Sequence, residues 1–355
     1  MSIININKVD LKKQPLFFGE GMGIQRYDVF KYPKFFDLFQ NQLSFFWKPE
    51  KINLAQDQAD FKKLTDSEKR IFTKNLGFQT LLDSVQTRGI PNILEYCSNL
   101  ELEACAVIWQ AFEQIHSYSY TYIIKNIYPN PSEVFDSFME DEEILKRASS
   151  VTKQYDNLIN SISEDNEYDL KKKLYLTLVS INILEGIRFY VSFACSFAFA
   201  ELGKMEGNAK IISEIQRDEQ QHLAITQNLL KYLRNNPDEG FQQVVEDCED
   251  LVIQMYSDSS EEEFGWADYL FKEGGMLGLN SEILNIFRKW LTDKRMKGIG
   301  VKPLFGVNRN PINWMNKWMS SKGVQVAPQE VEVESYKVDS LKQDGHKVDF
   351  NQFNF

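Results

Sequence analysis

Apolar residues recur every three to four positions along most of the chain, a spacing that is typical of amphipathic helices. Segments that alternate apolar and polar residues, as strands do, are few and short. The pattern predicts long helices, which cover residues 65–89, 98–129, 170–202 and 208–234. Further helices are predicted over about 27–45, 133–162, 240–257 and 260–296. We therefore expect an all-α bundle with long members.

Local signals mark the ends of two of these helices. The sequences Thr65-x-x-Glu68 and Ser98-x-x-Glu101 have the form of capping boxes, in which two side chains satisfy free backbone groups of the first turn. We expect the first of these helices to stop at Gly89, because a proline follows two residues later.

The most apolar stretch, residues 174–202, is long enough to raise the question of a membrane span. It carries Glu185 and Arg188 near its middle, and ionised side chains are costly inside a bilayer. We therefore interpret the stretch as a buried helix of a soluble protein and expect no membrane contact.

Charge and cysteine content narrow the possible partners and the compartment. The formal net charge of −11 and the pI near 5.0 argue against nucleic acid as a partner, because no basic excess is available to neutralise phosphates. No cysteine belongs to a C-x-x-C pair, which favours buried thiols in a reducing compartment. The N-terminus lacks the apolar stretch of a signal peptide, so we expect a cytoplasmic protein.

The last part of the chain has a different composition. From Val324 onward the apolar period of a helix disappears. We predict two parts, a helical domain over 1–323 and a flexible tail over 324–355 that ends in an aromatic, polar segment.

Histidine gives the first indication of chemistry. The chain has three histidines, and His116 and His222 each lie three residues after a glutamate, Glu113 and Glu219. Residues three apart on a helix share one face, so each pair can bind the same metal ion. One such pair arises easily by chance on a solvated surface. Two pairs in otherwise apolar helices predict a metal centre.

Two further carboxylates, Asp83 and Glu185, also lie in apolar helical sequence. Burying an ionised carboxylate without a partner is very costly. An ion pair between Glu185 and Arg188 is the alternative explanation for one of them. The four acids of this set formally balance two divalent cations, and oxygen and imidazole ligands suit iron or manganese. The order carboxylate, Glu-x-x-His, carboxylate, Glu-x-x-His is that of the di-iron and di-manganese carboxylate bundles, which include oxidases, ferritins and radical generators.

A tyrosine-rich segment follows the first motif. At about 100° per residue, only Tyr120, four positions after His116, returns to the same helix face, whereas Tyr118 and Tyr122 point away. Tyr120 is therefore expected beside the metals, although a core tyrosine with a satisfied hydroxyl has the same pattern.

The chain resembles the radical-generating small subunit of class I ribonucleotide reductase over nearly its whole length. The matching segments are PLFFGEGMGIQRYD (15–28), QLSFFWKPE (42–50), QTLLDSVQ (79–86), EQIHSYSYT (113–121), ILEGIRFYVSFACSFAFAE (183–201), MEGNAKII (205–212), RDEQQHL (217–223), WADYLF (266–271) and VQVAPQEVEVESY (324–336). The resemblance implies a ferritin-like helical bundle, two iron ions (with manganese or a mixed pair as options) and dioxygen for assembly of the cluster.

The resemblance also implies roles for individual residues. Tyr120 would carry a stable radical inside an apolar pocket of Phe189, Phe193 and Ile215. The implied metal ligands are Asp83, Glu113, His116, Glu185, Glu219 and His222.

A route for the radical is implied as well. Trp47 and Asp218 would lead electrons and protons from the metals to the surface, and Tyr336 would pass the radical to the large subunit. Taken alone, Trp47 could equally be a core residue and Asp218 a solvated charge. The segment that would dock on the large subunit has apolar anchors at Phe350, Phe353 and Phe355.

The implied activity is ribonucleoside-diphosphate reduction by a homodimer together with the large subunit. Another ferritin-like di-iron oxidase and an iron-storage protein are the alternatives. The sequence departs from the family at Tyr118, Tyr122 and Phe112, where relatives more often carry Arg, His and a small polar residue. The segment between Ile159 and Lys171 is also shorter than in some relatives.

Overall fold

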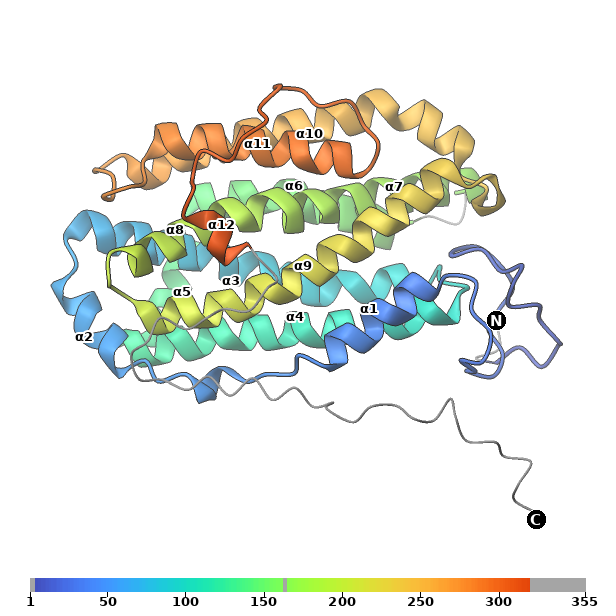
Figure 1. Cartoon of the computed structure of the whole chain (residues 1–355), viewed down its shortest axis with the longest axis horizontal. Coiled ribbons are helices and arrows are strands. Elements are labelled where there is room, and N and C mark those ends of the chain that lie inside the picture. The colour runs from blue at the N-terminus through green and yellow to red at the C-terminus, as the bar shows by residue number, and fades with distance from the viewer. Residues whose placement is uncertain (1–3, 162–164, 320–355) are drawn as a thin grey trace, which may run out of the picture.

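A computed structural model describes residues 4–161 and 165–319, and its regular structure is helical (Figure 1). The main helices are α1 (Pro33–Leu43), α2 (Ala55–Lys63), α3 (Asp66–Leu94), α4 (Leu100–Ile127), α5 (Pro131–Met139), α6 (Glu142–Ile159), α7 (Glu167–Ile183), α8 (Phe189–Glu201), α9 (Glu206–Asn235), α10 (Gln242–Phe271) and α11 (Ser281–Gly298). Short helical segments are η1 (Pro49–Lys51), the π-helical turn η2 (Leu184–Arg188), η3 (Pro237–Glu239) and α12 (Met315–Trp318). Within the described residues only isolated β-bridges occur, so the all-α prediction is confirmed.

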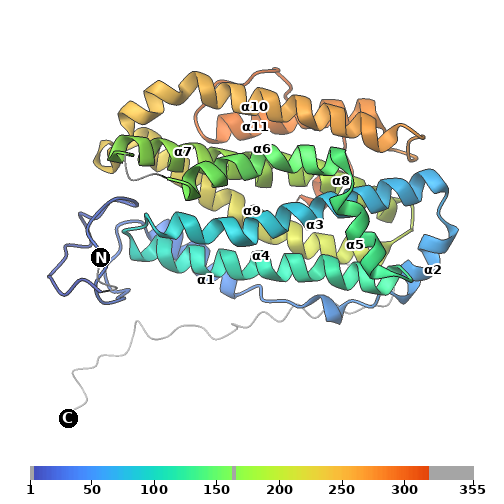
Figure 2. The same cartoon turned by 180° about the vertical axis from the view of Figure 1, so that it is seen from behind.

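The long helices form layers that are visible in both views (Figures 1 and 2). Helix α3 lies along α4, and α9 packs against both α7 and α8. The pair α10 and α11 covers one side of this bundle, next to α6 and α7, while α1 lies on α4 and α9. The predicted boundary between a domain and a tail, at residues 323 and 324, falls outside the described residues.

The start of α3 was predicted correctly, but its end was not. Thr65 forms the expected capping box. The helix continues through Gly89 and Pro91 to residue 94. Proline has no N–H to donate to the carbonyl one turn earlier. Here the amide of Gln110 on α4 approaches that carbonyl, the oxygen of Thr87, at 3.5 Å.

The predicted cap of α4 is wrong by one residue. The cap is Asn99, whose side-chain oxygen accepts a hydrogen bond from the N–H of Leu102 at 2.9 Å. The Ser98 hydroxyl instead donates to the carbonyl of Pro15. Glu101 accepts from backbone N–H groups just before α1. Both residues of the predicted capping box, Ser98 and Glu101, therefore bind groups outside α4 instead of capping it.

Helix boundaries near the C-terminal end also differ from the prediction. Helix α10 runs through the break predicted near residue 258, and the real break, 272–280, contains Gly274 and Gly278 with positive φ angles of 125° and 81°. Such angles strain other residues and so mark a turn. The segment predicted over 133–162 is two helices, α1 begins later than predicted, and α2 was not predicted.

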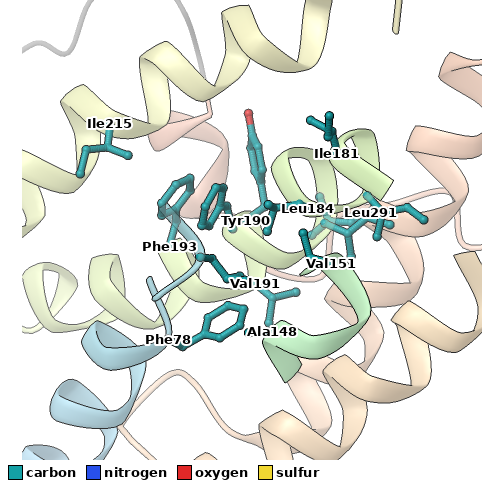
Figure 3. Close-up of a cluster of buried hydrophobic side chains, with 14 of the residues drawn as sticks. Phe78, Ala148, Val151, Ile181, Leu184, Tyr190, Val191, Phe193, Ile215 and Leu291 are labelled. Carbon is teal, nitrogen blue, oxygen red and sulfur yellow. The ribbon is translucent and has the colours of Figure 1, made fainter. Parts of the chain in front are cut away.

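The apolar stretch forms the predicted buried helix, made of α7, η2 and α8. Within the described residues this one helix, Glu167–Glu201, is long and apolar enough to cross a membrane, but 94% of its most apolar window is buried inside the protein. Its packing is that of a core helix. Figure 3 shows Leu184 of η2 and Val191 of α8 in an apolar cluster with Phe78, Val151 and Leu291, which come from α3, α6 and α11.

Candidate metal centre

Four helical segments bring the predicted ligands together in the middle of the bundle. Each side chain is fully buried, with an exposed fraction of 0%. Helices α3 and η2 each supply one carboxylate, while α4 and α9 each supply a Glu-x-x-His pair. The residues are Asp83, Glu113, His116, Glu185, Glu219 and His222.

The two Glu-x-x-His pairs face each other across the bundle. The Nδ1 atom of His116 lies 3.2 Å from a carboxylate oxygen of Glu219, and Nδ1 of His222 lies 3.1 Å from an oxygen of Glu113. Ligand atoms of these four residues all lie within 4.8 Å of one another. This spacing places two carboxylates and two imidazoles around a volume of the size that metal ions need.

The other two carboxylates have oxygen atoms without partners. Both oxygens of Asp83 and one oxygen of Glu185 are buried and make no hydrogen bond in the structure. Burial, together with the charges of neighbouring carboxylates, raises the pKa of both groups well above the ordinary value. Buried polar atoms are normally paired, so these oxygens call for a cation. Oxygen and imidazole donors with free lone pairs fit a pair of divalent metal ions.

The histidines have the electrostatic surroundings of metal ligands. Burial alone would lower the pKa of both, but nearby carboxylates outweigh it and raise the pKa of His222 to about 9. The pKa of His116 rises well above the ordinary value in the same way, through Asp218, Glu113 and Glu219. The excess of negative charge therefore attracts protons to the positions where divalent cations would bind.

Glu185 does not form the ion pair considered as its alternative explanation. The guanidinium of Arg188 points away and donates to Glu262 at 2.6 Å, to Glu263 at 3.3 Å and to Ser150 at 2.8 Å. Glu185 instead accepts a hydrogen bond of 2.8 Å from the amide of Gln86.

Tyr120 lies one turn beyond His116 and is fully buried. Burial and then the charge of Asp83 raise the pKa of its hydroxyl well above the ordinary value. Phe189 and Phe193 stack with ring centroids 5.8 Å apart and are fully buried, as is Ile215. Figure 3 shows Phe193 and Ile215 on the facing helices α8 and α9.

A hydrogen-bonded chain leads away from His116. Its Nε2 lies 3.2 Å from Oδ2 of Asp218, and the indole N–H of Trp47 donates to the same oxygen at 2.7 Å. Trp47 is only 5% exposed, and its ring centroid lies 6.4 Å from that of His116. Asp218 is buried too, so the alternative interpretation of Asp218 as a solvated surface charge is wrong.

The sequence reasoning missed side chains that hold the ligands in place. The hydroxyl of Tyr155 donates to Gln86 at 2.7 Å, and Gln86 in turn holds Glu185. The indole of Trp109 donates to Glu113 at 2.9 Å. The sequence did carry a signal for Gln86, because this polar residue lies three positions after Asp83 in a largely apolar helical segment.

The extra tyrosines of α4 point toward residues 50–52. The hydroxyl of Tyr118 donates to Glu50 at 2.5 Å, and that of Tyr122 donates to the carbonyl of Ile52 at 2.9 Å. Phe112 is buried in the core. The other predicted site residues, Tyr336, Phe350, Phe353 and Phe355, lie outside the described residues.

Residues 26–311 match the family described as "Ribonucleotide reductase, small chain". The chain belongs to the ribonucleotide reductase small-chain family. It is 46% identical to a ribonucleoside-diphosphate reductase subunit beta of Buchnera aphidicola, over 98% of this chain and 97% of the relative. It is 39% identical to the subunit beta of Enterobacteria phage T4, over 97% and 96%. A solved ribonucleotide reductase R2 subunit from Clostridium botulinum superimposes with a TM-score of 0.79 at 30% identity, over 86% of this chain and 94% of that chain.

This membership confirms the resemblance drawn from the sequence and the ferritin-like fold. The chain is thus an oxidoreductase component, and a small chain implies a large-chain partner and a dimer. Iron storage and an independent oxidase are disfavoured, because the relatives are reductase subunits.

Proposed function

We propose that this chain is the radical source of a ribonucleoside-diphosphate reductase, and that it acts as a cytoplasmic homodimer together with the large subunit. The observation that supports this best is a fully buried tyrosine, Tyr120, beside a buried set of carboxylates and histidines that lacks a cation from the chain itself.

The metal ligands in this proposal are the six buried residues of the centre. Asp83, the two Glu-x-x-His pairs and Glu185 would hold two metal ions, and iron, manganese or a mixed pair would each suit these donors. When bound, such a pair supplies, with dioxygen, an oxidant strong enough to take an electron and a proton from a tyrosine.

Tyr120 would become the stored radical. Its hydroxyl lies next to Asp83, the carboxylate that could accept the departing proton. A phenoxyl radical persists only where water and reductants are excluded. The fully buried Phe189, Phe193 and Ile215 supply apolar surroundings of this kind.

The chain Trp47, Asp218 and His116 would connect the metals with the surface. Asp218 accepts from the indole N–H and also contacts the imidazole, so a proton can shift along this carboxylate when an electron leaves Trp47. Tyr336 would continue the route, and Phe350, Phe353 and Phe355 would dock the tail on the large subunit.

Electron paramagnetic resonance on iron-loaded, oxygen-exposed protein tests the radical. We expect a tyrosyl signal that Tyr120→Phe abolishes. Tyr256→Phe and Tyr118→Phe are the controls, one removing a buried hydroxyl that donates to Asn182 and one removing an exposed hydroxyl that donates to Glu50, and both should keep the signal. A full signal in Tyr120→Phe would refute the assignment.

Removing residues 349–355 tests the tail. The truncated protein should keep its radical but lose binding to the large subunit. Trp47→Phe is the complementary variant, which should keep both the radical and the binding but lose turnover. Unchanged binding after truncation would contradict the docking role.

A further inference from the structure

A buried arginine on α11, Arg295, has no carboxylate partner among the residues that the structure describes. It is 5% exposed, and no carboxylate oxygen in the described residues lies within 4 Å of its side-chain nitrogens. Burying a guanidinium away from an acid is costly unless other groups satisfy it. Its contacts should therefore show what it is used for.

The arginine contacts the π-helical turn that carries Glu185. Its Nε donates to the backbone carbonyl of Gly186 at 2.8 Å. A Cβ atom at Gly186 would lie 3.0 Å from Cγ, Cδ and Nε of Arg295, so the absence of a side chain lets the arginine approach the backbone. The contact joins two residues that are 109 positions apart in the sequence.

A π-helical turn needs this kind of support. Single π turns are rare, and they occur mostly as bulges inside α-helices at functional sites. Its backbone hydrogen bonds are shifted by one residue, as in the bond from the N–H of Phe189 to the carbonyl of Leu184, so the turn departs from the α-helical ladder. A fixed donor from α11 therefore favours the π conformation of η2, and this conformation sets where the neighbouring Glu185 points.

The same guanidinium is linked to a second ligand helix. It lies over the ring of Tyr190, 4.8 Å from the ring centroid. The Tyr190 hydroxyl accepts a hydrogen bond of 3.3 Å from the amide of Gln216, which precedes Glu219 by three residues on α9. Arg295 thus contacts the backbone beside one ligand and the aromatic ring that touches the helix of another.

We propose that Arg295 is a positioning residue that holds the π turn and so fixes Glu185 as a ligand of one of the two metal ions. This inference rests on the proposed metal function. Asp83 and the two Glu-x-x-His pairs do not touch Arg295 in the structure, so the effect should fall on one ion more than on the other.

Titration of the metal-free, full-length protein with Mn(II), followed by electron paramagnetic resonance, tests this. Wild-type protein should bind two ions. Arg295→Met should weaken the binding of one ion by about tenfold or more, the usual effect of removing a group that orients a ligand, and weaken the binding of the other ion less. Arg295→Lys should restore part of the loss, because an ammonium can still donate to the Gly186 carbonyl.

Arg288→Met is the matched control. Arg288 is also buried on α11 and packs on an aromatic ring, but its hydrogen bonds go to Asn285 and to Ser260 and Glu261 on α10. Its loss should leave both Mn(II) affinities unchanged in the folded protein. If Arg295→Met does not fold, Gly186→Ala provides the test. Its added Cβ would displace the side chain of Arg295 from the Gly186 carbonyl, while the charges of Arg295 and Glu185 remain.

The outcomes separate the inference from the proposed function. Wild-type binding of two ions with unchanged affinities in Arg295→Met and Gly186→Ala overturns the role of Arg295. Equal weakening of both ions also overturns it, because it indicates a general structural effect. Failure of the wild-type protein to bind two ions contradicts the metal function itself.

Discussion

Two largely buried groups of charged side chains in the described part of the protein differ in the source of their positive charge. One is the candidate metal centre described above. The other, which we name the ion-pair network, consists of Arg147, Arg188, Ser150, Glu262 and Glu263.

The ion-pair network is neutralised from within the chain. Glu263 accepts hydrogen bonds from both Arg147 and Arg188, and Arg188 also binds Glu262. The guanidinium of Arg147 lies over the rings of Phe78 and Trp266, at 3.3 and 4.7 Å from their centroids. In the metal centre, by contrast, no lysine or arginine of the described residues forms an ion pair with a predicted ligand.

The contrast shows how to distinguish a structural charge cluster from a metal site. Carboxylates that fold against arginines already have their partners. Carboxylates that fold against each other, with oxygens left without hydrogen bonds, need a cation from solution. The first group should therefore determine the stability of the metal-free protein, and the second should respond to metal.

The largest expected effect is the gain of stability on metal binding. Each ion at about one hundred times its dissociation constant adds about 2.7 kcal/mol to the free energy of unfolding, so two ions add about 5 kcal/mol. Urea unfolding with and without Mn(II) measures the gain. His222→Ala should lose most of this gain when compared with its own metal-free form, which is the reference because removing a buried imidazole 3.1 Å from Glu113 also destabilises the metal-free protein. A full gain in His222→Ala would contradict the assignment of the site.

Breaking the ion-pair network should have the next largest effect. Glu263→Ala leaves two buried guanidinium groups without their shared carboxylate, which costs about 3–5 kcal/mol. The loss should appear in urea unfolding of the metal-free protein and should be the same with metal present. Glu262→Ala is the control, and its effect should be smaller because this carboxylate is 31% exposed. Equal effects of the two variants would argue against a buried network.

Tyr155 supports Gln86 and, through it, Glu185, and a methyl group added at Gly89 would collide with the Tyr155 ring. A Cβ at Gly89 would lie 2.2 Å from the ring of Tyr155, so Gly89→Ala should destabilise the protein by about 2 kcal/mol through overpacking. Gly265→Ala is the control, because no atom lies within 4 Å of its Cβ position in α10. It should stabilise by about 0.5–1 kcal/mol. Thermal unfolding of both variants checks the opposite signs.

The smallest expected effect concerns Asp57, which accepts hydrogen bonds from the backbone N–H groups of Gly207 and Asn208 at the start of α9. Burial outweighs these hydrogen bonds and raises the pKa of Asp57 to about 6. A raised carboxyl pKa gives stability that is present below about pH 4 and is lost as the pH rises through 6.

Stability relative to Asp57→Asn should therefore fall by about 1–2 kcal/mol between pH 5 and 7.5. Using the difference between the two proteins cancels the titration of the metal ligands. A difference that rises with pH would show that the backbone hydrogen bonds dominate over burial.

Much of the arrangement of the candidate metal ligands could be predicted from the sequence, because the geometry within each Glu-x-x-His pair is local. Glu113 and His116, or Glu219 and His222, share a helix face whatever surrounds them, and Tyr120 follows His116 by one turn. Buried acids such as Asp83 were visible because the surrounding sequence is apolar. The family resemblance added roles to these positions, and it alone pointed to Trp47, Asp218 and Tyr336.

Only the tertiary structure decided which charges found partners within the chain. Arg188 is three residues from Glu185, but it pairs with Glu262 and Glu263, more than 70 positions away. Gln86 and Arg295 reach the η2 turn from α3 and α11, and neither contact has a local signal. Helical periodicity determines which residues share a face, because it depends on the backbone alone. Which faces meet, and so whether a buried carboxylate contacts an arginine or needs a metal, depends on the packing of distant helices.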